Sequence, residues 1–162
     1  MAYGTDSGAD VYHEQRNNTV WATLSDDAKT GARVRVSDYI DAMYGSRFPG
    51  VKTGGRVQEN QWPRTGATDS SGVDIAPNEV PLEIIKAVYE GALLEGKQPG
   101  ILAPTTTPKS QKVLTEVKGI KWTIVGDKTT SAPTYLPQIP IIDALMAGLL
   151  GVPDFGSVLV IS

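Results

Sequence analysis

The strongest constraint on how this chain can fold is a long central stretch, residues 46–79, that shows no hydrophobic period. It holds eight of the turn formers glycine and proline: Pro49, Gly50, Gly54, Gly55, Pro63, Gly66, Gly72 and Pro77. Loops of this length are uncommon in a compact domain and are usually either functional or disordered. Because Trp62 lies within the stretch, we expect the long loop 45–79 to be anchored and functional.

Amphipathic helices are predicted on both sides of this loop. Ser7 is expected to cap a helix that runs to about Asn17 and is followed by a short apolar connector. Ser25, with two carboxylates after it, is expected to cap a second helix that ends at Gly45. Its apolar stripe holds Ala28, Ala32, Val36, Tyr39, Ile40 and Met43, and leaves Arg33, Arg35 and Asp41 outside.

Two more helices are predicted after the loop. The third has Asn78 as its cap and Pro81 in its first turn, and it ends around Gly96. Its buried stripe is formed by Ile84, Ile85, Val88, Ala92 and Leu93. The fourth follows Pro140, stops at Gly151 and should pack on the second and third helices through Ile141, Ile142, Leu145, Met146, Leu149 and Leu150.

Two runs rich in β-branched residues, 112–118 and 120–125, predict a β-hairpin that turns at Gly119, with Ile120, Trp122 and Ile124 on one face. The expected fold class is therefore α+β and mainly α: a small bundle of about four helices with a hairpin over 112–125 and a strand-like tail. Residues 1–151 are expected to form one helical domain, and residues 152–162 an interaction tail.

The tail contains four consecutive apolar residues, Val158, Leu159, Val160 and Ile161, without alternation. Such a run is typical of a strand that is buried on both faces, and in a monomer it is an aggregation hazard. Its backbone edge needs a partner sheet. The partner may be its own hairpin, a neighbouring subunit or another protein, and the residues alone leave all three open.

Composition excludes several classes of protein. The formal net charge is −3 and the pI about 5.1, which is not the strong basic footprint of a dedicated nucleic-acid binder. The chain has no cysteine, so it has neither disulfides nor thiolate metal sites. The first residues do not form a signal peptide, and the longest apolar stretch is too short to span a bilayer. We expect a soluble protein made in the cytoplasm, with no membrane contact.

The sequence offers little catalytic chemistry. His13, near Asp10 and Glu14, is the only histidine, and a metal site normally needs more ligands of its kind. No phosphate-binding loop or nucleophile elbow is present. Asp69, Ser71 and Asp74 resemble the start of a calcium loop but lack its glycine and glutamate, so a polar turn is expected. We therefore expect no catalytic residue, no metal, no cofactor and no enzyme activity.

Positive charge gathers in the first part of the long loop. Residues 45–66 carry Arg47, Lys52, Arg56 and Arg64 against Glu59, a net charge of +3 (4 − 1), while the remainder of the chain is −6 (−3 − 3). Such a segment can contact an acidic protein surface, be solvated, or pair with phosphates while Trp62 stacks on a base. We rank these alternatives in that order.

Several short motifs together resemble a known family: Asp38-Tyr39-Ile40-Asp41, Ser46-Arg47-Phe48, Trp62-Pro63-Arg64-Thr65-Gly66, Val80-Pro81 and Ile142-Asp143-Ala144-Leu145. Over about residues 7–150 the chain is similar to the head-to-tail connector, or adaptor, proteins of tailed phages, which are often labelled DnaT-like single-stranded-DNA-binding proteins. The Trp-Pro-Arg-Thr-Gly run is the most specific of these motifs. The apolar tail lies outside the resemblance.

The resemblance implies a virion protein of the neck region. It would form a ring of twelve copies that joins the portal of the head to a tail or neck protein and continues the DNA channel, with genomic DNA only passing through. Trp62 and Pro63 would anchor the long loop together with Arg47 and Phe48, and Arg64 would meet a carboxylate or a helix C-terminus. Trp62 would pack either within its own chain or against a neighbouring subunit, and the residues leave both open. The tail 158–161 would add as a strand to a partner. The alternative is single-stranded-DNA binding through the basic loop 45–66.

Overall fold

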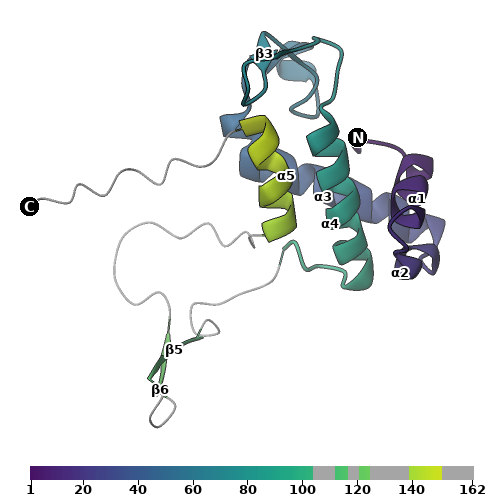
Figure 1. Cartoon of the computed structure of the whole chain (residues 1–162), viewed down its shortest axis with the longest axis vertical. Helices are drawn as coiled ribbons and strands as arrows, with labels where there is room; N and C mark the ends of the chain where they lie inside the picture. The colour runs from purple at the N-terminus through teal and green to yellow at the C-terminus, as the bar shows by residue number, and fades with distance from the viewer. Residues whose placement is uncertain (104–111, 117–120, 125–138, 151–162) are drawn as a thin grey trace, which may run out of the picture. The chain divides into compact units, whose positions relative to one another are not determined.

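The computed structural model describes residues 1–103, 112–116, 121–124 and 139–150. The chain divides into two units, Met1–Leu102 with Gln138–Ser162, and Ala103–Pro137. The first unit holds the helices α1 (Asp6–Glu14), α2 (Thr19–Ala22), α3 (Asp26–Tyr44), α4 (Leu82–Lys97) and α5 (Pro140–Leu150) (Figure 1). Helices dominate and the strands form small antiparallel pairs, so the predicted α+β, mainly α class is confirmed.

The N-terminal helix begins earlier than predicted. Its cap is Thr5 and not Ser7, because the Thr5 hydroxyl accepts a hydrogen bond from the Gly8 amide at 3.0 Å. The helix ends at Glu14, and the expected apolar connector contains the additional short helix α2. Residue Trp21 of α2 is buried, so tertiary packing and not local periodicity stabilises this single turn.

Helix α3 begins where the sequence predicts. The Ser25 hydroxyl accepts a hydrogen bond from the Ala28 amide at 3.3 Å, and Ala32, Val36, Tyr39 and Ile40 are buried. The prediction that Arg33 faces solvent is wrong. Its Nε donates to Asp6 at 2.7 Å and its Nη1 to the Gly4 carbonyl at 3.0 Å, because the N-terminal segment folds over this face of α3.

Three helices meet at Gly91. A Cβ at this position would lie 2.6 Å from Val36 Cγ1 of α3 and 3.1 Å from Ile142 Cδ1 of α5, so only glycine permits so close an approach. Helix α5 packs against α4 and also reaches the end of α3, where the Tyr44 hydroxyl donates to Asp143. The predicted packing of α5 on α4 is thus confirmed, with a smaller contact to α3, but the predicted part of Ile141 in it is wrong because this residue is 45 % exposed.

The ends of α4 differ from the prediction. Pro81 is the N-cap, without a side-chain hydrogen bond, so Asn78 is not the cap. The helix continues through Gly96 to Lys97. Gly96 is tolerated inside the helix because Leu24 packs against it, and a Cβ there would lie 2.4 Å from Leu24 Cδ1.

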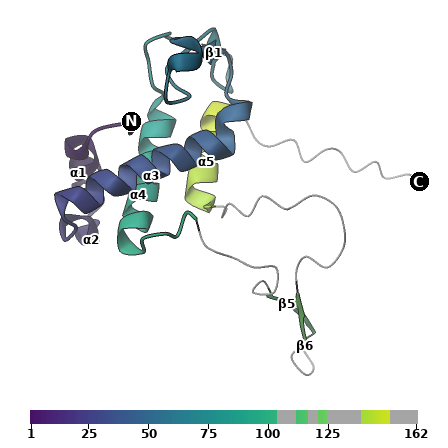
Figure 2. The ribbon, with the colours of Figure 1, turned by 180° about the vertical axis from the view of Figure 1, so that it is seen from behind.

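The long loop 45–79 forms a lobe made of very short elements, at the end of α3 that lies away from α1 and α2 (Figures 1 and 2). Two pairs of two-residue strands are antiparallel: β1 (Val51–Lys52) with β2 (Arg64–Thr65), and β3 (Ala67–Thr68) with β4 (Asp74–Ile75). The 3-10 turns η1 (Gly45–Arg47) and η2 (Gly55–Val57) complete it. Ser70 Oγ donates to the Gly148 carbonyl at 2.6 Å, which attaches the lobe to α5.

The second unit contains the predicted hairpin. Strands β5 (Lys112–Glu116) and β6 (Lys121–Ile124) are antiparallel, with Leu114 opposite Trp122 and a register shift between Leu114 and Glu116. The predicted turn at Gly119 and the predicted tail 152–162 lie outside the described residues. None of the described helices combines the length and the apolar character needed to cross a bilayer.

The crossing at Gly91 can be tested with a pair of alanine substitutions. Gly91→Ala should lower the free energy of unfolding by about 1–3 kcal/mol, because overpacking exceeds the gain in helix propensity. Gly148→Ala is the matched control, since its nearest foreign atom, Glu83 Cγ, lies 3.6 Å away, and this variant should gain up to about 1 kcal/mol. Denaturant unfolding measures both. A Gly91→Ala protein as stable as wild type would contradict the close packing.

Candidate functional site

The Arg64 guanidinium lies at the centre of the lobe. Its side chain is buried and makes five hydrogen bonds, to the carbonyl oxygens of Pro49 (2.7 Å), Gly50 (2.6 Å), Gln61 (3.2 Å) and Phe48 (3.4 Å) and to the Gln61 side-chain oxygen (3.1 Å). No carboxylate among the described residues accepts from it. The expectation of a carboxylate or helix C-terminus is therefore corrected: Arg64 satisfies loop carbonyls that have no strand partner.

Trp62 anchors the lobe within its own chain. It is 2 % exposed, and its ring packs edge-on against Phe48 with centroids 5.7 Å apart. The Trp62 amide donates to the Tyr3 hydroxyl at 3.1 Å, which in turn donates to Asp41 at 2.6 Å. The Trp62–Pro63 peptide bond is cis. Because the indole is enclosed, it cannot stack on a nucleic-acid base in this conformation.

Only part of the basic loop is available to a partner. The Lys52 ammonium donates to the Gln58 carbonyl at 2.6 Å, and Arg64 is buried. Arg47 is exposed, with its guanidinium 5.9 Å from the centroid of the Tyr44 ring. Arg56 is exposed and makes no hydrogen bond or ion pair with any other described residue. The free cations of this loop are therefore Arg47 and Arg56.

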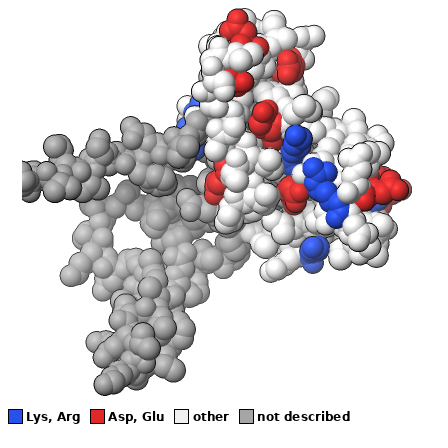
Figure 3. Space-filling model, in the orientation of Figure 1, with Lys and Arg blue, Asp and Glu red and all other residues white. Residues whose placement is uncertain are grey.

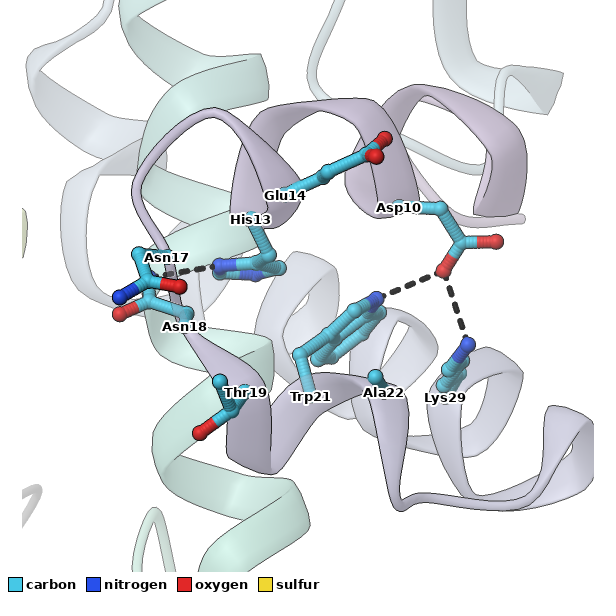
Figure 4. A pocket seen from close by; sticks show the side chains of 9 residues that line it. All are labelled: Asp10, His13, Glu14, Asn17, Asn18, Thr19, Trp21, Ala22 and Lys29. Carbon is cyan, nitrogen blue, oxygen red and sulfur yellow. Dashed lines mark hydrogen bonds and ion pairs between the residues drawn. The ribbon is translucent and has the colours of Figure 1, made fainter.

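A pocket of about 370 Å³ opens between α1 and α2, and it contains His13 (Figure 4). The histidine is buried, and its Nε2 lies 3.1 Å from the Tyr89 carbonyl oxygen, which can only accept, so Nε2 carries the proton. Its Nδ1 then accepts from the side-chain Nδ2 of Asn18 at 3.1 Å. Both ring nitrogens are thus used inside the fold, and burial lowers the pKa of His13.

The other polar groups of the pocket are partly paired. Asp10 Oδ1 accepts from Trp21 Nε1 at 2.7 Å and from Lys29 Nζ at 2.9 Å (Figure 4). The hydrogen bond from Lys29 lowers the pKa of Asp10. The Glu14 side chain is exposed and makes no hydrogen bond or ion pair with another described residue. Across the described ranges, no group of three or more His, Cys, Asp or Glu side chains could hold a metal ion.

The calcium-like segment is a polar turn. Asp69 Oδ1 accepts hydrogen bonds from the amides of Ser71 at 2.8 Å and Val73 at 2.9 Å. The carboxylate thereby closes the turn between β3 and β4 in the way short polar side chains commonly do.

Glu95 is a structural residue that the sequence prediction did not include. It is fully buried, and its carboxylate accepts from Arg35 Nε at 2.7 Å and from the amides of Gly100 at 2.8 Å and Leu102 at 3.4 Å. It fixes the turn at which the chain leaves the first unit. Glu95 lies seven residues, or about two helical turns, after the buried Val88 and therefore on the apolar stripe of α4. This spacing could have predicted from the sequence that Glu95 is buried.

Charge is divided between the two units of the fold. Unit Ala103–Pro137 has five lysines and two carboxylates, a net charge of +3 (5 − 2), and the rest of the chain is −6 (10 − 16). On the face of the first unit seen in Figure 3, both acidic and basic side chains are present and several of them lie side by side. The excess positive charge therefore belongs to the hairpin unit. The proposed tail residues Val158 to Ile161 lie outside the described part of the chain.

A family model with the description "Putative DnaT-like ssDNA binding protein" matches residues 2–161. No curated protein and no solved structure was found to match the chain.

The role of Arg64 predicts a strong effect of a conservative change. Arg64→Lys should lower the free energy of unfolding by about 2–3 kcal/mol, because an ammonium cannot reach carbonyls on both sides of the lobe and leaves some unsatisfied. Limited proteolysis should then cut within residues 45–79. The control, Arg56→Lys, should stay within about 0.5 kcal/mol of wild type. Equal losses in both variants would contradict a specific role of the buried guanidinium.

The environment of His13 predicts a pH dependence of stability. Its pKa is lowered in the folded state, so below about pH 6.5 the unfolded chain binds a proton that the folded chain excludes. The free energy of unfolding should therefore fall as the pH drops from about 7.5 to 5.5. In His13→Gln this slope should be absent. Denaturant titrations across the pH range measure it, and an unchanged slope in the variant would show that other groups cause it.

Proposed function

Because the chain belongs to the family of DnaT-like single-stranded-DNA-binding proteins, we propose that it binds single-stranded DNA, mainly through the lysine-rich unit Ala103–Pro137. The family model spans nearly the whole chain, so the hairpin unit is part of the family's domain and not an addition to it. The observation that carries the proposal is the charge of this unit. The net charge of the unit is +3, whereas that of the rest of the chain is −6.

The lysines of this unit suit contact with a flexible phosphate backbone. They are Lys109, Lys112, Lys118, Lys121 and Lys128, and the hairpin strands hold two of them together with Trp122. Lysine pairs with phosphate as a point charge and needs no fixed geometry, and an aromatic residue can add base stacking. Binding would therefore be electrostatic, sensitive to salt and largely independent of base sequence.

The lobe is a weaker candidate for the DNA contact than its sequence suggests. Of its four cations, Arg64 is buried and Lys52 is bonded to the backbone, and the Trp62 ring is enclosed. Two arginines, Arg47 and Arg56, remain exposed. A basic loop that stacks Trp62 on bases would require the lobe to open and to lose the hydrogen bonds of Arg64.

Neutralising the lysines tests this proposal. A variant with all five lysines of Ala103–Pro137 changed to Gln should bind an oligo-dT probe much more weakly than wild type in fluorescence anisotropy. The slope of log K against log salt should become smaller by about 0.7 for each phosphate contact that is lost. The matched control changes the exposed Arg47, Arg56, Lys86 and Lys97 to Gln and should keep most of the affinity.

Two outcomes would contradict the proposal. If the control variant loses binding and the hairpin variant does not, DNA is bound by the first unit. If wild type shows no salt-dependent binding at low ionic strength, the protein does not bind single-stranded DNA by charge.

A second function, assembly as a head-to-tail connector ring in a phage neck, is favoured by the surface of the lobe. Val57 is 94 % and Val51 67 % exposed, and Val73 of the same lobe is 62 % exposed. Apolar side chains on a lobe that Arg64 holds rigid are typical of a surface covered by a protein partner. The motifs shared with connector proteins, including Ser46-Arg47-Phe48 and Trp62-Pro63-Arg64, lie on this lobe or beside it.

In this second function the protein would be a virion component with no catalytic role and no cofactor. Copies would form a ring of about twelve, an expectation from the resemblance and from the closure of head-to-tail contacts. The portal and a tail or neck protein would cover its two faces, and the lysine-rich units would meet DNA that passes through the channel. The two functions are therefore compatible, since both require the basic unit to contact DNA.

Deletion of residues 152–162 tests the assembly function. The apolar run 158–161 is expected to add as a strand to a partner, so particles assembled with the truncated chain should fail to join heads to tails. Electron microscopy of such particles, with free heads and free tails counted, measures the effect. If the truncated protein joined heads to tails normally, the proposed role of residues 152–162 in assembly would be contradicted.

A further inference from the structure

Positive charge by itself does not select a single strand of DNA. A duplex carries about one negative charge per 1.7 Å of helix axis and releases more counterions per contact than a single strand does, so lysines without other contacts favour the duplex. An aromatic ring distinguishes the two, because an unpaired base can stack on it, whereas the bases of a duplex are stacked on each other. A preference for single strands therefore requires a ring that is open to a base.

The aromatic rings of the first unit are not open in this way. Seven of them, among its described residues, are at most 6 % exposed: Tyr3, Trp21, Tyr39, Tyr44, Phe48, Trp62 and Tyr89. The eighth, Tyr12, is half-buried. Its ring lies 5.4 Å from that of Tyr89 between centroids, and the Arg16 guanidinium carbon lies 3.5 Å from its centroid. A base could stack on Tyr12 only after these contacts had been displaced.

Three aromatic residues remain: Trp122, Tyr135 and Phe155. Phe155 belongs to residues 151–162, which contain no lysine or arginine, and Tyr135 is seven residues from the nearest cation in the sequence, Lys128. Trp122, by contrast, directly follows Lys121 within the hairpin of the lysine-rich unit. Trp122 therefore combines an aromatic ring with cations for the adjoining phosphates.

The register of the hairpin places a second lysine near Trp122 (Figure 1). Trp122 of β6 is opposite Leu114 of β5, and Ile124 is opposite Lys112. Residues that are directly opposite or two apart share a face of the ladder, so these four residues occupy one face. Diagonal neighbours such as Lys112 and Trp122 are about 7–8 Å apart. The described part of this unit contains no further strand or helix that could cover the face.

We propose that Trp122 is the residue that distinguishes single-stranded from double-stranded DNA. Its indole would stack on an unpaired base, Lys112 would pair with a neighbouring phosphate, and Leu114 and Ile124 would extend the apolar surface beside the stacked base. This inference rests on the DNA-binding function proposed above and names the specificity-determining residue of that site. Stacking accepts every base, so the preference would be for single strands and not for a sequence.

Trp122→Leu on the full chain, measured with three probes of equal length, tests the inference. The probes are oligo-dT, an abasic oligonucleotide that has phosphates but no bases, and a duplex. Wild type should bind oligo-dT roughly tenfold or more tighter than the abasic probe. The variant should lose this difference but keep its affinity for the abasic probe and the duplex. Its salt slope should be unchanged, because no charge is altered. Trp122→Phe retains a ring and should keep most of the preference.

Tryptophan fluorescence provides a second readout. Oligo-dT should quench the emission of wild type, because a stacked base contacts the Trp122 indole. The same probe should leave the emission of Trp122→Leu nearly unchanged, since Trp21 and Trp62 are each 2 % exposed.

The matched control is Tyr12→Leu, which removes the least buried described ring of the first unit and should bind all three probes as wild type does. The inference is wrong if Trp122→Leu still prefers oligo-dT to the abasic probe, or if Tyr12→Leu loses that preference instead. Equal weakening for all three probes would also overturn it, because Trp122 would then support the hairpin and not contact bases. In these cases salt-dependent binding through the lysines would still stand. A wild-type chain that bound none of the probes would overturn both.

Discussion

The lobe depends on one buried cation. Residues 45–79 have too few regular strands to pair their own backbone, and the Arg64 guanidinium donates to four of their carbonyls. Its planar guanidinium donates to Pro49 and Gly50 on one side and to Gln61 on the other. One side chain thus hydrogen-bonds to backbone on both sides, as a central strand does in a sheet. A stretch rich in glycine and proline thereby becomes a rigid surface.

Hydrogen bonds from polar side chains also attach the lobe to the helices. These side chains bond to distant backbone groups or to each other. Tyr3 links the N-terminal segment to Asp41 of α3 and to the Trp62 amide, and burial together with Asp41 raises the Tyr3 pKa. Ser70 bonds the end of α5. Glu95 performs the equivalent task at the other end of α4, where it fixes the turn before the hairpin unit begins. Ordered irregular segments therefore surround a small core centred on Gly91.

This arrangement separates two kinds of charge that the sequence mixes. Cations bonded inside the first unit, such as Arg33 and Arg64, serve its structure, whereas the lysines of Ala103–Pro137 form an excess that the fold sets apart in a second unit. The first unit presents carboxylates and exposed valines, which suit protein contacts. The DNA contact and the protein contact proposed above would therefore belong to different parts of one short chain.

Local patterns in the sequence determined the helices, the Ser25 cap, the hairpin and the mainly α class, because apolar period and capping chemistry act within a few residues. Only the tertiary structure decided the rest: the extra helix α2, the burial of Arg33 and Glu95, the carbonyl partners of Arg64 and the enclosure of Trp62. Each of these depends on groups far apart in the chain, such as Tyr3 and Trp62. Those long-range hydrogen bonds also decide which cations remain available to a partner. A local hydrophobic period in the sequence cannot reveal them.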